Sequence, residues 1–154
     1  MDEMKQLKVF TVEEANRLVP KLTEVLTAAR AKQREILAKE VEIDTLELLY
    51  VEGGGETVGG GEEGKLAPEV AREVETYNEA VNQFYCLIDE IHEIGCFLKD
   101  IETGLVDFYA LYQGRVVYLC WKLGEPEVGF WHEVGRGYAY RQPLLKEGER
   151  ESSG

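Results

Sequence analysis

Residues 115–122, RVVYLCWK, form the stretch with the strongest strand character in this sequence. β-Branched and aromatic side chains fill it, and such side chains are enriched in strands because they pack well on a pleated surface. Gln113-Gly114 precedes the stretch and Gly124-Glu125-Pro126 follows it, so turn residues bound it on both sides. The sequence therefore predicts a central strand in the C-terminal part of the chain.

Weaker strand signals lie on both sides of this stretch. They are the strand or connector Gly95–Lys99, the strands Leu105–Phe108 and Glu127–Val134, and the segment Tyr138–Arg141 after the turn Gly135-Arg136-Gly137. Turns at such short spacing are typical of an antiparallel meander. We expect a small antiparallel sheet over residues 95–145, followed by a disordered tail over residues 146–154.

The N-terminal part has helical periodicity instead. Thr11 and Glu14 have the spacing of a capping box, in which each side chain satisfies the backbone of the other. From there a four-three spacing predicts a long helix that packs along a partner, with a bend rather than a break at Pro20. The spaced positions are Leu18, Leu22, Val25, Ala29, Lys32, Ile36, Lys39, Ile43, Leu46 and Tyr50.

A second helix is predicted to begin at Pro68 and to stop at Gly95. Its four-three positions are Val70, Val74, Tyr77, Val81, Phe84, Ile88 and Ile91. Between the helices, residues 52–66 are rich in glycine and glutamate, which favours a flexible loop over a phosphate loop. The expected fold class is α+β: a long antiparallel, coiled-coil-like helical hairpin over residues 1–94, then the sheet.

Net charge is −13, and residues 1–94 contribute −11 of it. Such an acidic surface repels phosphate, which argues against nucleic acid as a partner. No apolar run is long enough to span a membrane and no signal peptide is evident, so we expect no membrane association and a cytoplasmic location. The three cysteines, Cys86, Cys96 and Cys120, form no CxxC pair and are expected to be free thiols.

Two helices alone bury little apolar surface, and the first helical pattern is long. The exposed faces of two hairpins can pair as a four-helix bundle. We therefore expect a homodimer that forms through the helices.

Most of the chain resembles an uncharacterised bacterial family, the domain of unknown function 2203. The similarity lies in FTVEEANRLVPKL near the N-terminus and in LKDIETGLVDFYAL and GRVVYLCWKLGEPEVGFWHEVGRGYAYRQPL further on, from about Phe10 to Leu144. The resemblance implies no activity, so candidate sites rest on residue chemistry alone.

The stretch from Glu127 to Pro143 concentrates the residues with the most chemistry. His132 can bind a divalent metal together with carboxylates, and the metal candidates are His132, Asp107 and Glu133. The alternative is a histidine that hydrogen-bonds within the sheet, and alternation places the His132 and Glu133 side chains on opposite faces. Asp107 interrupts an apolar strand and needs a partner if buried, for which Arg115, Arg136 or Arg141 is available.

A small-ligand site is the other candidate, with Trp131, His132, Arg136, Arg141 and Tyr118 as its residues. Guanidinium groups bind carboxylates or phosphates, and aromatic side chains form the apolar wall of many pockets. The alternative is internal pairing of the arginines and an aromatic core. His92 and Glu102 are expected to have structural roles at a helix end and a turn, while Asp100 can either cap that turn or help to bind a cation.

Two functions remain open from the sequence. The first is a noncatalytic, homodimeric protein-interaction module built on the helical hairpin, with a protein partner at the sheet. The second is a metal- or small-ligand-binding protein, a class that includes enzymes, using His132, carboxylates and arginines on the sheet. No cofactor is indicated by a motif, and the residues do not decide whether the protein is an enzyme.

Overall fold

The computed structural model describes residues 7–52 and 68–145. The predicted glycine-rich loop (52–66) and tail (146–154) therefore lie almost wholly outside the described residues. Two helices come first, then five strands and a short 3-10 helix, so the chain is α+β as expected. Within the described residues, neither helix combines the length and apolar character needed to cross a membrane.

The long helix α1 runs from Val12 to Glu52. Its start is the predicted capping box, because the Glu14 N–H donates to Thr11 Oγ1 and the Thr11 N–H donates to Glu14 Oε1, each at 3.0 Å. Two N–H groups that have no partner within the helix are satisfied in this way. Pro20 lies inside α1 without ending it.

The second helix, α2, runs from Pro68 to Ile94, with the predicted proline at its first position. Gly95 follows it with a φ of 106° and donates its N–H to the His92 carbonyl. A positive φ favours glycine, so the residue predicted as the stop is the residue that ends the helix.

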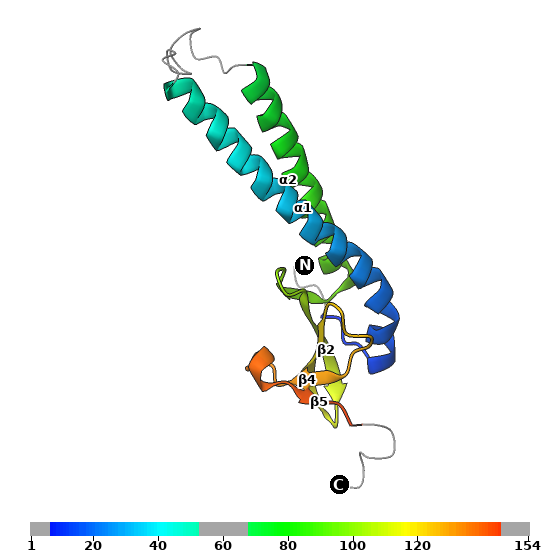
Figure 1. Ribbon diagram of the computed structural model, residues 1–154. Coiled ribbons are helices and arrows are strands. Elements are labelled where there is room, and N and C mark those ends of the chain that lie inside the picture. Colours follow the sequence, from blue (N-terminus) through cyan, green and yellow to red (C-terminus); the bar gives the residue numbers. More distant parts are fainter. Residues whose placement is uncertain (1–6, 53–67, 146–154) are drawn as a thin grey trace. The chain divides into compact units, whose positions relative to one another are not determined.

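The chain forms two compact units, and the division falls inside the helices. One unit comprises residues 28–87, in which α1 and α2 form the helical hairpin (Figure 1). Lys39 Nζ lies 3.7 Å from Glu73 Oε1, and the Tyr77 hydroxyl donates to Glu40 at 3.1 Å. Each contact joins one predicted four-three position, Lys39 or Tyr77, to a glutamate of the other helix that lies outside the pattern.

The other unit comprises residues 1–27 and 88–154 and contains the sheet. Its strands are ordered β1-β2-β3-β4-β5, and every neighbouring pair is antiparallel. The strands are β1 (Phe97–Asp100), β2 (Leu105–Tyr112), β3 (Arg115–Lys122), β4 (Phe130–His132) and β5 (Gln142–Pro143). The predicted meander and its central strand β3 are confirmed.

Turn chemistry explains why β2 is longer than predicted. Gln113 and Gly114 have φ values of 54° and 84°, as in the two-residue turns that match the twist of a hairpin. Such a tight turn lets the strands pair right up to it, and Tyr112 lies opposite Arg115. The β2 strand therefore ends at Tyr112 and not at Phe108.

The inner face of the sheet carries the core of this unit. Its alternate residues are at most 1% exposed: Val106, Phe108, Ala110, Val117, Leu119 and Trp121. Phe108 meets the ring of Phe10 edge-on at 5.1 Å. The first turns of α1 lie beside the sheet (Figure 1) and bury Ala15, Val19 and Leu22.

Two segments after β3 differ from the prediction. The third predicted strand, Glu127–Val134, is reduced to β4: before it the Val128 N–H donates to the side chain of Asn16, and after it the Arg136 N–H donates to the Glu133 carbonyl in a turn. Tyr138–Tyr140 is the 3-10 helix η2, in which Arg141 donates its N–H to the Tyr138 carbonyl, and not an extended segment.

Candidate functional site

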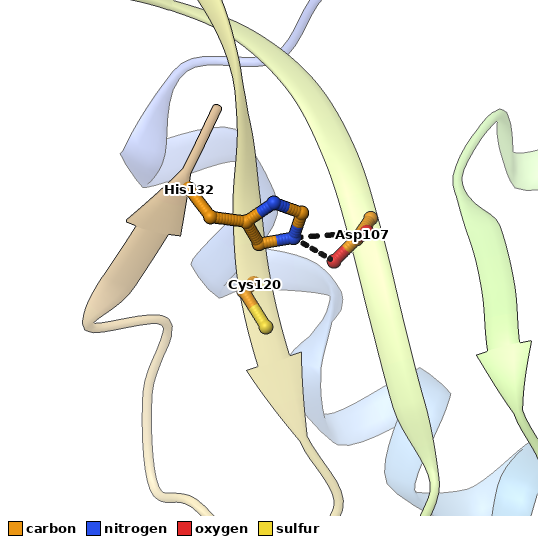
Figure 2. A group of neighbouring side chains, drawn as sticks. All are labelled: Asp107, Cys120 and His132. Atoms are coloured by element: carbon orange, nitrogen blue, oxygen red, sulfur yellow. Dashed lines mark hydrogen bonds and ion pairs between the residues drawn. The ribbon is translucent and has the colours of Figure 1, made fainter. Parts of the chain in front are cut away.

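The outer face of the sheet buries three chemically reactive side chains. Asp107 comes from β2, Cys120 from β3 and His132 from β4, so each of three adjacent strands supplies one (Figure 2). Asp107 and Cys120 lie directly opposite each other in register. His132 lies opposite Tyr118, which is the neighbour of Cys120 on the same face of β3. We call these three residues the outer-face cluster.

The ring of His132 is held at both nitrogens. Nδ1 lies 2.9 Å from the backbone carbonyl of Glu133, and Nε2 lies 3.2 Å from each carboxylate oxygen of Asp107. A carbonyl only accepts, so Nδ1 carries a proton and donates it to Glu133. His132 and Asp107 are each 2% exposed, which makes this a buried acid–base pair.

Burial dominates the electrostatics of the other two groups. It raises the pKa of the Asp107 carboxyl above its usual value, while His132 and then Lys99 act in the opposite direction. Burial, reinforced by the charge of Asp107, raises the pKa of the Cys120 thiol to about 12. The thiol is therefore protonated at neutral pH, and Cys120 is no ready nucleophile.

Aromatic side chains line one side of the cluster. The Tyr118 ring lies 5.4 Å from the His132 ring and stacks on Tyr109 at 4.9 Å. Lys99 Nζ lies 4.9 Å from the centre of the Tyr118 ring. Burial and the hydrogen bond with Tyr109 raise the pKa of Tyr118 to about 12, so it is a neutral wall at physiological pH.

Arg141 lies at the other side of the outer-face cluster. Its guanidinium pairs with the carboxylate of Glu125, and NH1 lies 3.8 Å from Cys120 Sγ. The same group lies 3.9 Å from the ring centre of Phe130 and 4.4 Å from that of Tyr138. Burial alone lowers the pKa of Arg141, but Glu125 and Cys120 outweigh it and the pKa is raised.

The structure therefore brings together part of the predicted site. His132, Asp107, Tyr118 and Arg141 all lie on or against the outer-face cluster. The buried partner of Asp107 is His132, and not one of the arginines that the sequence suggested.

The remaining candidates lie elsewhere. Trp131 belongs to the inner face, opposite Leu119. Glu133 follows β4 and its exposed carboxylate pairs with Arg115 at 3.3 Å. Arg136 lies 4.6 Å from the ring centre of Tyr140, so this guanidinium is stacked outside the cluster.

Sequence reasoning did not assign Cys120 to the site. Alternation within β3 placed it on the Tyr118 face, but the strand register that puts Cys120 opposite Asp107 is a tertiary feature. Its neighbours in sequence are apolar, which made it look like an ordinary core thiol. The signal available beforehand was alternation within β3, which puts Cys120 on the same face as the candidate Tyr118.

Asp100 caps the turn after β1, while His92 lies near the end of α2 and Glu102 lies at the same turn as Asp100. Asp100 Oδ2 accepts hydrogen bonds from the Thr103 hydroxyl at 2.7 Å and from its N–H at 3.3 Å. The His92 carbonyl accepts from Gly95 at the end of α2. Glu102 is exposed at this turn.

The described part of the sheet-containing unit has cavities, among them the following. One cavity has a volume of about 240 Å³ and is lined by Leu105 and Lys122. These two residues pair across β2 and β3, next to the pair Asp107 and Cys120 on the outer face. Asp100, Thr103 and Tyr138 complete its lining. A second, of about 560 Å³, lies at the end of α2 beside His92. The cavity of about 240 Å³ therefore lies beside the outer-face cluster on the same face of the sheet.

Comparison with known proteins gives one match. A family model described as an uncharacterized conserved protein, DUF2203, matches residues 8–144. No curated protein and no solved structure matches the chain.

Proposed function

The chain belongs to the DUF2203 family of uncharacterised conserved proteins, and we propose that it is a noncatalytic protein-interaction module that forms a homodimer through its helical hairpin. The observation that carries this proposal is an exposed apolar surface on α1. Leu37, Val41 and Leu48 are 55%, 65% and 58% exposed. We call these three residues the outer stripe.

The outer stripe runs along a single side of α1. At about 100° per residue, Leu37, Val41 and Leu48 fall within an arc of roughly 40°. Their spacing of four and seven residues is that of a coiled-coil seam. Three exposed apolar side chains on one side of a helix cost free energy when they are left in water, so they favour an occupant, and Asp44 lies between Val41 and Leu48 on that side.

The outer stripe is distinct from the side of α1 that faces α2. Ile36, Lys39, Ile43 and Leu46 are half-buried and lie roughly 160° around the helix from the outer stripe. Lys39 pairs with Glu73 of α2, which identifies that side as the intramolecular one. The helix thus has two apolar sides, and the hairpin itself uses one.

Charge supports a second copy of the chain as the occupant. Arg34 and Asp44 are exposed and lie on the same side of α1 as the outer stripe. Two α1 helices can pair antiparallel about a twofold axis that crosses the outer-stripe side at the level of residue 39. In this pairing Leu37 meets the partner's Val41. Arg34 then meets the partner's Asp44, so these positions are complementary about the twofold axis, as a twofold interface requires, while Leu48 lies toward the partner's Arg30.

Light scattering on the full chain, across micromolar concentrations, tests the proposal. We expect a particle with twice the 17.5 kDa chain mass. Leu37 is 55% exposed, so Leu37→Glu removes roughly half of the about 1.5–3 kcal/mol of full apolar burial from each copy, and the dimer weakens by at least about 10-fold. The matched control is Leu49→Glu: Leu49 is 60% exposed but lies roughly 100° away from the stripe, and its substitution leaves the dimer intact.

Charge reversal tests the register. Asp44→Arg sets two arginines against each other and weakens the dimer, whereas the double variant Arg34→Asp with Asp44→Arg restores the complementary pair. A wild-type monomer at these concentrations would rule out the homodimer. If neither Leu37→Glu nor Asp44→Arg changes the dimer affinity, the interface lies elsewhere.

A further inference from the structure

The outer-face cluster has a composition that internal stability does not explain. Buried ion pairs are often no more stabilising than apolar residues of similar volume, because removing the charges from water is costly. Here a carboxyl, an imidazole and a thiol are all at most 2% exposed within one small sheet. A function that needs all three groups in one place accounts for them better than packing does.

The donor atoms lie close together. One ring nitrogen of His132, one carboxylate oxygen of Asp107 and Sγ of Cys120 all lie within 4.8 Å of one another, and Figure 2 shows the sulfur pointing away from the imidazole. They come from three neighbouring strands, so the backbone hydrogen bonds of the sheet hold them in place. Figure 2 shows the imidazole and the carboxylate pointing toward each other above the cysteine.

The ring of His132 has the tautomer that metal ligation needs. Its Nδ1–H donates to the Glu133 carbonyl at 2.9 Å, which leaves Nε2 as the nitrogen that offers a lone pair in the neutral ring. Histidine ligands of metals are commonly oriented by such a bond from the other ring nitrogen to a backbone carbonyl. The backbone of β4 therefore aims Nε2 into the cluster.

We propose that Asp107, Cys120 and His132 form a binding site for a divalent transition-metal ion of the Zn²⁺ class. One nitrogen, one oxygen and one sulfur donor suit this borderline-soft ion, whereas Mg²⁺ and Ca²⁺ take oxygen ligands. Two donors on a tetrahedral Zn²⁺ lie about 3.3–3.6 Å apart, given bonds of about 2.0–2.3 Å. Nε2 and the Asp107 oxygens already lie 3.2 Å apart, so Cys120 needs the main adjustment, on the order of 1 Å.

The charges of the site balance. A carboxylate and a thiolate carry the two negative charges that match one Zn²⁺, and the neutral imidazole completes the ligand set. Binding releases the thiol proton and the proton shared between Asp107 and His132. Arg141 approaches Cys120, but its positive charge is paired with Glu125 and does not stand alone beside the ion.

Three protein ligands leave a fourth position for water or another small ligand. In the described part of the chain, no further His, Cys, Asp or Glu joins this group. Purely structural zinc sites hold four protein ligands, so the fourth position here is open to an exchangeable water or small ligand, and the proposal assigns binding and no reaction to it. The inference concerns the sheet and is independent of dimerisation through the hairpin.

Cobalt titration of the untagged, chelator-treated full chain tests the site. Co²⁺ reports a cysteine ligand by a thiolate-to-metal charge-transfer band and a tetrahedral geometry by intense visible bands. We expect both with one ion per chain, and we expect one Zn²⁺ per chain to displace the cobalt. Cys120→Ser abolishes the charge-transfer band, and His132→Gln weakens Zn²⁺ binding by more than about 100-fold.

The chain supplies matched controls. Cys96→Ser removes the other buried thiol and His92→Gln the other histidine, and both variants keep the cobalt spectrum. Because Cys120→Ser can unfold the sheet, wild-type protein is also alkylated with and without Zn²⁺ during mild unfolding, where Zn²⁺ is expected to slow modification of Cys120. Wild-type protein without a charge-transfer band, or a band that survives Cys120→Ser and vanishes in Cys96→Ser, would overturn the proposal.

Discussion

The side-chain oxygen of Asn16 accepts the backbone N–H of Val128 at 2.6 Å, across 112 positions of sequence. The bond ties the first turns of α1 to the segment before β4. Val128 is 2% exposed, so without Asn16 its N–H would be buried and unpaired. This contact therefore helps to hold the N-terminal turns of α1 beside the sheet.

Asn16→Ala is expected to lower the free energy of unfolding by about 1–2 kcal/mol, because a buried donor loses its acceptor. Urea denaturation followed by tryptophan fluorescence measures this change. Asn16→Asp keeps an oxygen at the same place and should lose less. Asn78→Ala, at an exposed helical position, should be neutral or slightly stabilising; an equal loss in Asn78→Ala would contradict this account.

Gly104 is expected to tolerate no larger side chain. Its φ is 72°, and an added Cβ would lie 2.5 Å from Leu123 Cβ. We expect Gly104→Ala to cost at least about 2 kcal/mol, since backbone strain and overpacking add. Gly114→Ala, with φ of 84° and open space around it, should cost only about 1 kcal/mol from strain. Thermal unfolding of both variants checks the ranking, and equal losses would remove the steric argument.

The cysteines should differ sharply in reactivity. Cys86 is exposed, while Cys96 and Cys120 are buried and burial raises the pKa of each thiol to about 12. The thiolate is the reactive form, so at pH 8 the two buried thiols remain protonated and unreactive in the native protein. Mass spectrometry after brief alkylation should find one label, at Cys86, and three labels in denaturant. Rapid native labelling of Cys96 would show that the end of α2 opens readily.

Arg141 should resist replacement by lysine. Its guanidinium stacks on Phe130 and Tyr138 and pairs with Glu125, which a lysine ammonium cannot reproduce together. We expect Arg141→Lys to cost about 1–2 kcal/mol in chemical denaturation. Arg136→Lys is the control, because Arg136 stacks on Tyr140 at an exposed position and should lose at most about 0.5 kcal/mol. Equal losses of stability in Arg141→Lys and Arg136→Lys would mean that the stacking of Arg141 on Phe130 and Tyr138 contributes little to the free energy of unfolding.

Local chemistry made several elements predictable. The capping box of Thr11 and Glu14, Pro68 at the start of α2 and Gly95 at its end all act through atoms a few residues away. The β3 strand was recognisable for the same reason, because its β-branched and aromatic side chains favour extended backbone wherever they occur. These features confirm the α+β order of helices and sheet.

Elements that depend on distant residues were predicted less well. Before the β4 strand, the Val128 N–H donates to Asn16, which is far away in sequence. Tyr138–Tyr140 forms η2, whose closing residue Arg141 packs on Phe130 of β4, and no local pattern distinguishes that segment from a strand. Such a contact exists only after the sheet has formed.

By itself, the sequence determined where the helices begin and end and which part forms the sheet, and it offered His132 and Asp107 only among several candidate polar residues there. The tertiary structure alone decided that Asp107 faces His132 and that Cys120 joins them. The physical reason is register: shifting a strand by one residue reverses the face of every side chain, and pairing across strands is set by the whole core. Side-chain chemistry can therefore be recognised in the sequence, but which donors meet is decided by the assembled sheet.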